Sequence, residues 1–253
     1  MDAALRWHSA SEDDVPSGLQ WLSDRERERT ARMRYAKRRT DYLLSRFTAK
    51  SALLGVLGIA EPGDLSAFTR VEIANASDGA PDPRVDGSAA PVSLSMTDRA
   101  GWAVCLVGPP GRSLGCDLEL VEPRTELFIR DYLTAREAAA VMAHPAGEHR
   151  DLAANLAWSA KESALKVLRT GLRRDTRSVE VSYDPGAAEG WQEMAMTVDG
   201  ERVFPGWWQR FGDFVLTVAA DDGEALPTPV PLVAPPGLSG GSPSHGWMRR
   251  PLV

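Results

Sequence analysis

The chain has 253 residues and a formal net charge of −6. This length allows one large domain or two halves of roughly 100 residues with a substantial core. A general nucleic-acid-binding protein would carry a strongly basic balance, so the acidic total argues against that class. We therefore expect a soluble globular enzyme with no nucleic-acid partner.

The two cysteines, Cys105 and Cys116, both lie in apolar runs typical of strands. Neither has a CxxC neighbour or a nearby histidine cluster, which argues against a disulfide scaffold and a zinc site. The first residues do not resemble a signal sequence, and no apolar run approaches the ~20 residues that span a bilayer. We expect a cytoplasmic protein without a membrane partner.

The first part of the chain is predicted to be helical. The sequence Ser23-Asp24-Arg25-Glu26 is a capping box, so a helix should begin there. A second helical stretch follows, with an apolar face and a basic face. The apolar face consists of Leu43, Phe47 and Leu54, and the basic face of Arg39, Arg46 and Lys50. Gly55 and Gly58 are expected to end this helix.

The next part is predicted to be a loop followed by strands. Residues 60–90 are rich in glycine, proline, aspartate and alanine, and only 70–74 among them has a strand pattern. Three strands separated by two turn-like segments are then expected to form a meander. They lie at 92–95, 102–107 and 114–120.

A second capping box at Thr134-Ala135-Arg136-Glu137 predicts a short helix that stops near Pro145, because the residue before proline disfavours helix. A longer helix is expected over about 151–169, with Gly171 as its terminator. Its predicted core residues are Leu152, Leu156, Leu165 and Leu168. Further strands are predicted at 178–183, 191–198 and 214–220.

Both halves of the chain run from helices to strands, although no residue-level repeat is visible between them. We therefore predict an α+β fold of two pseudo-twofold halves, 1–110 and 111–220, with the active site at their interface. The segment 221–253 is dominated by proline, glycine and serine, which bury too little apolar surface to offset ordering entropy. It is expected to be a mobile tail.

Two acidic residues mark the strand predicted at 114–120. Asp117 and Glu119 are two positions apart, so strand geometry places both on one face, with Leu118 on the other. Neighbouring carboxylates repel unless a proton or cation lies between them, and magnesium is a natural occupant. Taken alone, such a pair in an acidic protein is more often a solvated strand face.

The helix predicted over 151–169 carries a second constellation. Trp158, Glu162 and Lys166 are four residues apart and share one helix face. Taken alone, this is also the spacing of an ordinary surface ion pair with Trp158 in the core. Three carboxylates from two elements, however, form the incomplete oxygen shell that magnesium completes with water and phosphate oxygens. The combination favours a metal site.

These two segments resemble the G-x-D-x-E and W-x-x-K-E-x-x-x-K motifs of 4′-phosphopantetheinyl transferases, specifically the longer surfactin-synthetase-activating (Sfp) type. The motifs occur in the family's order, and the resemblance covers roughly 21–220. It implies transfer of the 4′-phosphopantetheine group of coenzyme A to a serine hydroxyl of an apo acyl or peptidyl carrier protein, with release of 3′,5′-ADP.

The resemblance also implies roles for individual residues. Asp117, Glu119 and Glu162 would ligate Mg²⁺, which would bridge to the diphosphate of coenzyme A. Glu162, or a metal-bound water, would take the serine proton. Lys166 would neutralise the transferring phosphate or the leaving group, and Lys161 would hold another phosphate oxygen.

Further coenzyme A contacts are expected from the first half. Arg39 and Arg46, with Arg29, are candidates for the 3′-phosphate, which guanidinium groups bind in bidentate fashion. The segment from Ser95 through Met96 to Thr97 resembles one in which a histidine, implicated in holding coenzyme A phosphate, stands where this chain has Met96. Methionine cannot donate a hydrogen bond. Either backbone amides and the two hydroxyls suffice, which we favour, or coenzyme A affinity is reduced.

Two other functions fit the same residues. A magnesium-dependent phosphodiesterase or nuclease would use the three carboxylates with water as nucleophile, and a non-catalytic descendant would only bind coenzyme A or a carrier protein. For the transferase, the region 129–141 is our candidate for carrier contact. The carrier would belong to fatty acid, polyketide or nonribosomal peptide synthesis, and the internal duplication favours a monomer.

Overall fold

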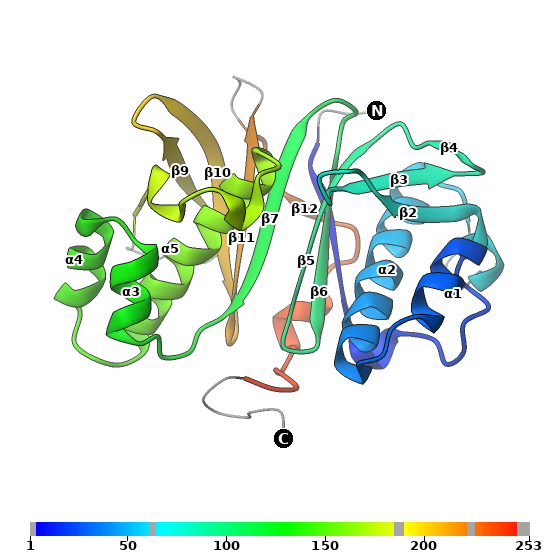
Figure 1. Cartoon of the computed structure of the whole chain (residues 1–253), viewed down its shortest axis with the longest axis horizontal. Helices are drawn as coiled ribbons and strands as arrows, with labels where there is room; N and C mark the ends of the chain where they lie inside the picture. Colours follow the sequence, from blue (N-terminus) through cyan, green and yellow to red (C-terminus); the bar gives the residue numbers. More distant parts are fainter. Residues whose placement is uncertain (1–3, 61–63, 185–189, 222–225, 247–253) are drawn as a thin grey trace.

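The computed structural model describes residues 4–60, 64–184, 190–221 and 226–246. It is a mixed α+β fold with two principal sheets, each covered by one long helix (Figure 1). The helices are α1 (Asp24–Ala31), α2 (Ala36–Leu57), α3 (Glu126–Tyr132), α4 (Ala135–Ala143) and α5 (Glu148–Val167). None of these described helices is both long and apolar enough to cross a membrane.

The first sheet has the strand order β12-β1-β6-β5, and α2 packs on β1 and β6. Its strands are β1 (Arg6–Ser11), β5 (Ser93–Arg99), β6 (Trp102–Gly108) and β12 (Val230–Pro231). A smaller three-stranded sheet lies beside α2 (Figure 1). It contains β2 (Val71–Asn75), β3 (Pro81–Val85) and β4 (Ser88–Ala89).

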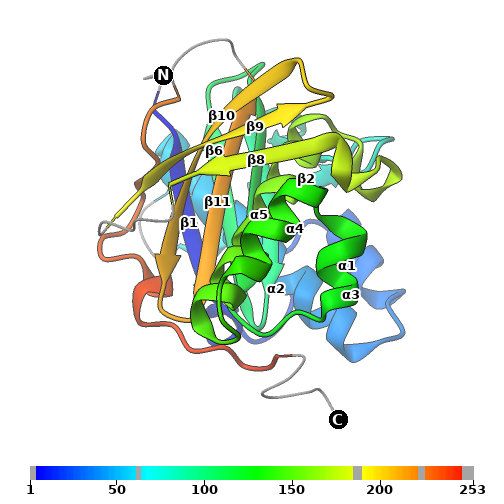
Figure 2. The same ribbon diagram turned by 90° about the vertical axis from the view of Figure 1, so that its left-hand side faces the viewer.

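The second sheet is antiparallel throughout, with the order β7-β11-β10-β9-β8. Its strands are β7 (Ser113–Leu120), β8 (Val179–Tyr183), β9 (Gln192–Val198), β10 (Arg202–Phe211) and β11 (Phe214–Asp221). Helix α5 packs on β7 and β11, and α3 and α4 lie beside α5 (Figure 2). Leu156 and Leu165 of α5 are buried on this sheet, and Leu152 and Leu168 pack at its edge, as their spacing predicted.

The two principal sheets meet where β5 runs beside β7 (Figure 1). No backbone ladder joins these described strands; two hydroxyls of β5 accept hydrogen bonds from backbone N–H groups of β7 instead. Ser95 Oγ accepts from Cys116 N at 3.0 Å, and Thr97 Oγ1 accepts from Leu118 N at 3.1 Å. The meander prediction was therefore wrong for β7, which belongs to the second sheet.

Helix α5 approaches β7 most closely at Gly115. A Cβ atom built on Gly115 would lie 1.9 Å from the backbone oxygen of Ser163. A side chain at this position would therefore push the helix away from the strand. Because Asp117 and Glu119 follow on β7 and Glu162 precedes Ser163 on α5, this contact brings the acidic residues of the two elements together.

We expect Gly115→Ala to lower the free energy of unfolding by about 3 kcal/mol, because the added methyl group meets rigid backbone. Denaturant titration measures this change. Gly240→Ala is the matched control, since nothing lies within 4 Å of its built Cβ, and a change within about 0.5 kcal/mol is expected there. Equal stability of the two variants would mean that α5 can move without cost.

A buried ion pair anchors the helix on the first sheet. Lys50 Nζ lies 2.5 Å from Glu26 Oε2, and both side chains are buried. Glu26 also accepts from the backbone N–H groups of Ser23 and Ile73 at 3.0 Å each. Lys50 donates to two further backbone carbonyls. The basic face predicted for α2 is thus partly internal, and Lys50 ties α1, α2 and β2 together.

The same contacts recur in the second half. Lys161 Nζ lies 2.8 Å from Glu137 Oε2, and Glu137 accepts from the backbone N–H groups of Thr134 and Val181 at 2.7 and 2.8 Å. Lys161 also donates to two backbone carbonyls. In each half, the acid of a capping box binds a buried lysine of the long helix and the first residues of a strand. These two sets of contacts share one pattern, whereas the two principal sheets differ in strand number and order.

Removing one partner of a buried ion pair leaves an uncompensated charge. We expect Lys161→Met and Lys50→Met each to lower the free energy of unfolding by about 3–5 kcal/mol. Arg136→Met, which removes the exposed ion pair with Glu180, should cost less than about 1 kcal/mol. Thermal and denaturant unfolding measure all three, and a mild effect at Lys161 would argue against its anchoring role.

Both predicted capping boxes are confirmed, and α4 ends at His144 as expected. Helix α2 ends at Gly58, which adopts φ +61, whereas Gly55 lies inside the helix. The strand predicted at 70–74 corresponds to β2, but the loop predicted for the rest of 60–90 was wrong, because its described part contains β3, β4 and a 3-10 helix at Leu65–Arg70. Helix α3 and strands β1 and β10 were not predicted.

The prediction of a mobile tail from 221 onward was wrong for 226–246. Strand β12 pairs in parallel with β1, and the side chains of Leu226 and Leu238 are buried in the core shared by the two sheets. The indole of Trp102 donates to the backbone oxygen of Ser242 at 3.1 Å. Residues 222–225 and 247–253 lie outside the described part. A few apolar side chains in a polar segment are therefore enough to hold it.

Candidate active site

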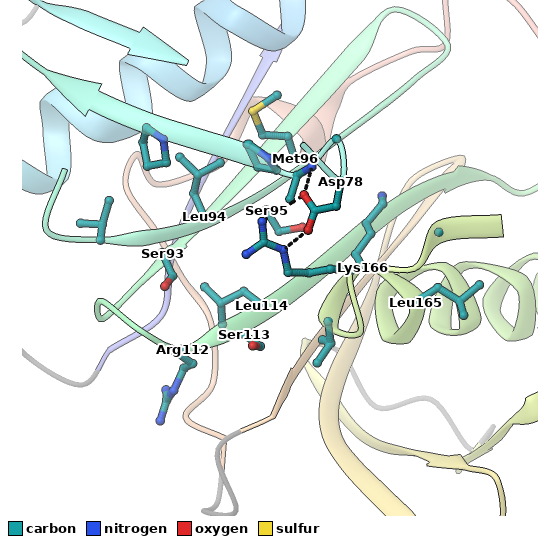
Figure 3. A pocket seen from close by; sticks show the side chains of 18 of the residues that line it. Asp78, Ser93, Leu94, Ser95, Met96, Arg112, Ser113, Leu114, Leu165 and Lys166 are labelled. Atoms are coloured by element: carbon teal, nitrogen blue, oxygen red, sulfur yellow. Dashed lines mark hydrogen bonds and ion pairs between the residues drawn. The ribbon is translucent and has the colours of Figure 1, made fainter. Parts of the chain in front are cut away.

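A cavity of about 480 Å³ opens where the two sheets meet (Figure 3). One wall comes from the β2–β3 turn and β5, and the other from the start of β7 and the end of α5. The polar and charged side chains on it are Asp78, Ser93, Ser95, Arg112, Ser113, Lys166, Arg169 and Arg173. The cavity therefore lies between the two predicted halves, and most of its charged side chains are basic.

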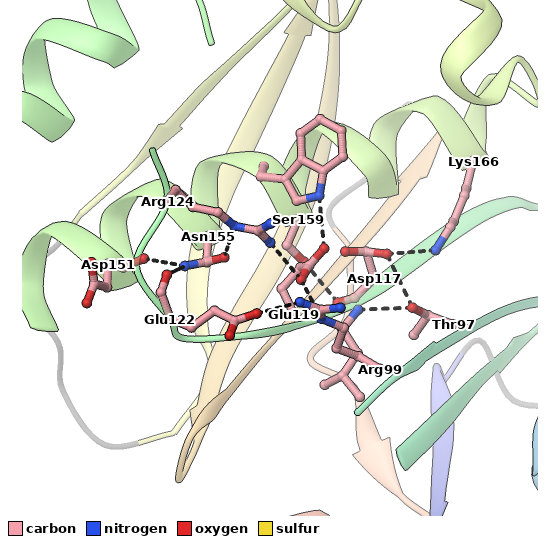
Figure 4. Close-up of polar contacts among 12 residues, drawn as sticks. Thr97, Arg99, Asp117, Glu119, Glu122, Arg124, Asp151, Asn155, Ser159 and Lys166 are labelled. Atoms are coloured by element: carbon pink, nitrogen blue, oxygen red, sulfur yellow. Dashed lines mark hydrogen bonds and ion pairs between the residues drawn. The ribbon is translucent and has the colours of Figure 1, made fainter. Parts of the chain in front are cut away.

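Asp117 lies on the face of β7 that meets α5, while Leu118 points into the core (Figure 4). Its Oδ1 atom accepts from Lys166 Nζ at 2.9 Å and from Thr97 Oγ1 at 3.2 Å. Its Oδ2 atom is buried and has no hydrogen-bond partner among the described residues. A buried carboxylate oxygen without a donor is costly, so this atom is suited to a cation ligand.

Glu119, two residues further along β7, is held by two hydrogen-bond donors and one further ion pair (Figure 4). Arg99 Nε and Arg124 Nη2 lie 3.0 and 2.9 Å from its Oε2 atom, and the Trp158 indole donates to Oε1 at 2.9 Å. Burial, together with the charge of Asp117, raises its pKa although the two arginines oppose this. In this arrangement, Glu119 binds the arginines and the tryptophan with both of its oxygens.

Glu162 and Lys166 face the strand from α5. Burial and the charges of Asp117 and Glu119 raise the pKa of Glu162 to about 7. Burial acts to lower the pKa of Lys166, but the carboxylate of Asp117 outweighs it and the pKa is raised. Lys166 also donates to the backbone oxygen of Cys116 at 2.8 Å. The three acidic side chains therefore share one electrostatic environment, with Lys166 at its edge.

The residues present fit magnesium in part. Mg²⁺ in proteins is usually bound by one or two carboxylates, with water and substrate phosphates completing its octahedron. Asp117, with its unpartnered Oδ2, and Glu162, with its raised pKa, have this character. Among the described residues, no three histidine, cysteine, aspartate or glutamate side chains are grouped so as to hold a metal ion. The arginines bind Oε2 of Glu119 and the Trp158 indole binds Oε1, so a third ligand from Glu119 would use a remaining lone pair.

The predicted coenzyme A residues are only partly brought together. Ser95, Met96 and Lys166 line the cavity, whereas Thr97 contacts Asp117 and β7 instead. The hydroxyls of Ser95 and Thr97 also join the two sheets, which the sequence did not reveal. The Met96 side chain packs against the core of the first half, and its thioether cannot donate a hydrogen bond.

Lys161 corrects a prediction that was based on the motif alone. Its side chain is fully buried and bound to Glu137 on the other side of α5, and it does not line the cavity. Arg39 and Arg46 do not line the cavity either. Arg39 is exposed, and Arg46 is buried against the ring of Tyr42 with a bond to Asn75 at 3.0 Å.

Several residues of the site were missed from the sequence. Arg99 and Arg124 flank the acidic motif in sequence, but arginines are common and nothing marked these two. Four other lining residues lie in turns or just after α5, where no periodic pattern indicates which way a side chain points. They are Asp78, Arg112, Arg169 and Arg173. The density of arginine after α5, at 169, 173 and 174, was the one available signal.

Residues 113–204 match the family model described as the 4′-phosphopantetheinyl transferase superfamily. The matched segment contains β7 and α5, and hence the acidic residues and Lys166 described above. Among curated proteins, the comparison found no match.

Among solved structures, 22 chains match. One is the crystal structure of Thermotoga maritima holo-[acyl-carrier-protein] synthase, with 20% sequence identity and a TM-score of 0.34. The alignment covers 50% of this chain and 80% of that chain.

The raised pKa of Glu162 predicts a pH-dependent stability in metal-free protein. The stability that its protonated form contributes is present below its ordinary pKa of 4.5 and is lost as the pH rises through about 7. At about pH 8, we expect Glu162→Gln to exceed the wild type in unfolding free energy by about 1–2 kcal/mol. Near pH 4.5 the two proteins should be about equally stable.

Denaturant unfolding with a chelator present, at both pH values, measures this difference. Glu180→Gln, at an exposed ion pair, is the control and should show the same offset from wild type at both. A difference for Glu162→Gln that does not change with pH would contradict the electrostatic environment described for this residue.

Proposed function

We propose that this protein transfers the 4′-phosphopantetheine group of coenzyme A to a serine hydroxyl of an apo acyl or peptidyl carrier protein, with Mg²⁺ as cofactor. The observation that carries the proposal is the juxtaposition of Asp117, Glu162 and Lys166 beside a basic cavity, inside the segment that matches the superfamily. The order of the two motifs along the chain resembles that of the surfactin-synthetase-activating type and supports a transferase of this type.

The reaction requires positive charge in a fixed position. A serine oxygen must attack a phosphorus atom surrounded by negative oxygens, and 3′,5′-ADP gains charge as the bond to phosphorus breaks. Lys166, held by Asp117 at 2.9 Å, is positioned to neutralise part of that charge. Mg²⁺, when bound by Asp117 and Glu162, would supply Lewis-acid stabilisation of the phosphate oxygens. The remaining basic side chains of the cavity would orient the nucleotide.

Glu162 is the proposed acceptor of the serine proton. In the metal-free protein its pKa is raised to about 7. Bound Mg²⁺ would lower this pKa and keep the carboxylate ionised at neutral pH, as a general base must be. Glu119 would have a positioning role through its contacts with two arginines and a tryptophan. Bound to Arg99, Arg124 and Trp158, it fixes the strand end and keeps the two guanidinium groups beside the site.

The carrier protein is proposed to bind at α3 and its surroundings. Within the region 129–141, Ile129, Leu133 and Val141 are buried in a local core, so they would support this contact from beneath. The neighbouring Leu127 and Tyr132 are exposed by 55% and 40%, and Tyr132 packs against Trp158 beside Glu119. An exposed apolar surface adjoining the site suits a partner that must present its serine there.

Incubation with coenzyme A, Mg²⁺ and apo carrier proteins tests the proposal, with intact-protein mass spectrometry as readout. We expect the carrier to gain the phosphopantetheine mass. Asp117→Asn, Glu162→Gln and Lys166→Met should each lower the rate by at least about 100-fold, and a chelator should abolish transfer. Each variant is compared by circular dichroism to exclude unfolding.

Glu180→Gln, which changes a carboxylate away from the cavity, is the control and should keep the wild-type rate. Release of 3′,5′-ADP without carrier modification would instead identify a phosphodiesterase. Binding of coenzyme A without any turnover on several carriers would identify a non-catalytic binding protein.

A further inference from the structure

The cavity contains more positive charge than the reacting diphosphate requires. Lys166, Arg112, Arg169 and Arg173 all line it, in a chain whose formal net charge is −6. Among the described lining residues, Asp78 is the single acid. Such local concentration of cations in an acidic protein indicates a ligand with several anionic groups.

Asp78 forms an ion pair with one of these cations, Arg169, across the cavity. Arg169 Nε lies 2.7 Å from Asp78 Oδ2, and Arg169 Nη2 donates to Asp78 Oδ1 at 3.0 Å (Figure 3). The pair joins the β2–β3 turn to the chain just after α5. This two-bond geometry is also how a guanidinium group binds two oxygens of a phosphate. Asp78 therefore lies where a phosphate on Arg169 would lie.

Arg169 lies just past the end of α5. Its φ of +57 is uncommon for a residue other than glycine, and it is the left-handed conformation that commonly ends a helix. Its carbonyl oxygen accepts from Arg173 Nη2 at 3.1 Å, so a second cavity arginine stabilises this turn.

Arg169 and Lys166 contact different parts of a ligand. Lys166 is bound to Asp117 at the acidic cluster, where the diphosphate would react. Arg169 follows three residues later, past the end of α5 at Val167, and its ion pair with Asp78 crosses to the β2–β3 turn on the opposite wall. It therefore reaches a second anionic group. In coenzyme A, the anion other than the diphosphate is the phosphate on the ribose.

We propose that Arg169 recognises the ribose 3′-phosphate of coenzyme A and that Asp78 is an internal competitor that this phosphate displaces. The proposal rests on the proposed function and adds the residues that select the substrate. Arg112 and Arg173 contribute further positive charge. Met96, which cannot donate to phosphate, would then be compensated by an arginine from the other half of the molecule.

Direct binding of coenzyme A and of dephospho-coenzyme A, which lacks the 3′-phosphate, tests this assignment without any carrier protein. Isothermal titration calorimetry in Mg²⁺ gives both dissociation constants for each protein. We expect Arg169→Gln to weaken coenzyme A binding by about 10- to 100-fold, the usual effect of losing a charged bidentate contact. Binding of dephospho-coenzyme A should change by less than about 3-fold.

Asp78→Asn should have the opposite effect, because it removes the competing charge while it keeps the side-chain shape. Coenzyme A binding should tighten several-fold, and Arg169→Lys should be intermediate because it keeps the charge but not the two-bond geometry. Arg177→Gln, at an exposed ion pair outside the cavity, is the control for general loss of positive charge. Melting temperatures identify any variant that is unfolded.

Three outcomes overturn the assignment. Equal weakening of both ligands by Arg169→Gln would place Arg169 on the diphosphate or in a structural role. Weaker coenzyme A binding by Asp78→Asn would show that the pair only ties the two halves together. Equal affinity of the wild type for both ligands would remove 3′-phosphate recognition but leave the proposed function intact, whereas binding of neither ligand would defeat the proposed function itself.

Discussion

The close contact between α5 and β7 at Gly115 is the constraint on which the site depends. The carboxylates of β7 and the Glu162 and Lys166 side chains of α5 interact only because the helix lies on the strand backbone. The glycine that opens the acidic motif thus has a packing role, and the positions of Asp117 and Glu119 beside α5 depend on it.

Fixed opposite charges organise the rest of the site. Asp117 is paired with Lys166, Glu119 with Arg99 and Arg124, and Asp78 with Arg169. Each pair holds a side chain in one orientation before any ligand arrives, which reduces the reorganisation that a charged reaction would otherwise need. Glu162 is dominated by burial and by the like charges of Asp117 and Glu119, which together raise its pKa.

The two buried lysines show that a charged residue inside a motif can have a structural role. Lys161 lies beside Glu162 in sequence, but on a helix adjacent residues point in different directions. Glu162 faces β7, whereas Lys161 enters the core and binds Glu137 and the backbone around the start of β8. Lys50 does the same in the first half. Both halves are therefore built around an internal cation that their sheets and helices share.

The sequence by itself determined the local features of this protein. Capping boxes, the amphipathic helix at 151–169, and the shared face of Asp117 and Glu119 depend on neighbouring residues, so their patterns were sufficient. The order of the motif with Asp117 and Glu119 and the motif with Glu162 and Lys166 also led to the proposed phosphopantetheine transfer. These signals concern spacing within a single element, where backbone geometry is regular.

Only the tertiary structure decided which side chains share the cavity. Arg169 and Asp78 are far apart in sequence and lie outside regular elements, so no periodicity relates them. The assignment of β7 to the second sheet, the folding of 226–246 onto β1, and the burial of Lys161 were decided in the same way. Pairing between distant segments depends on the packing of the whole core, which a local pattern does not contain.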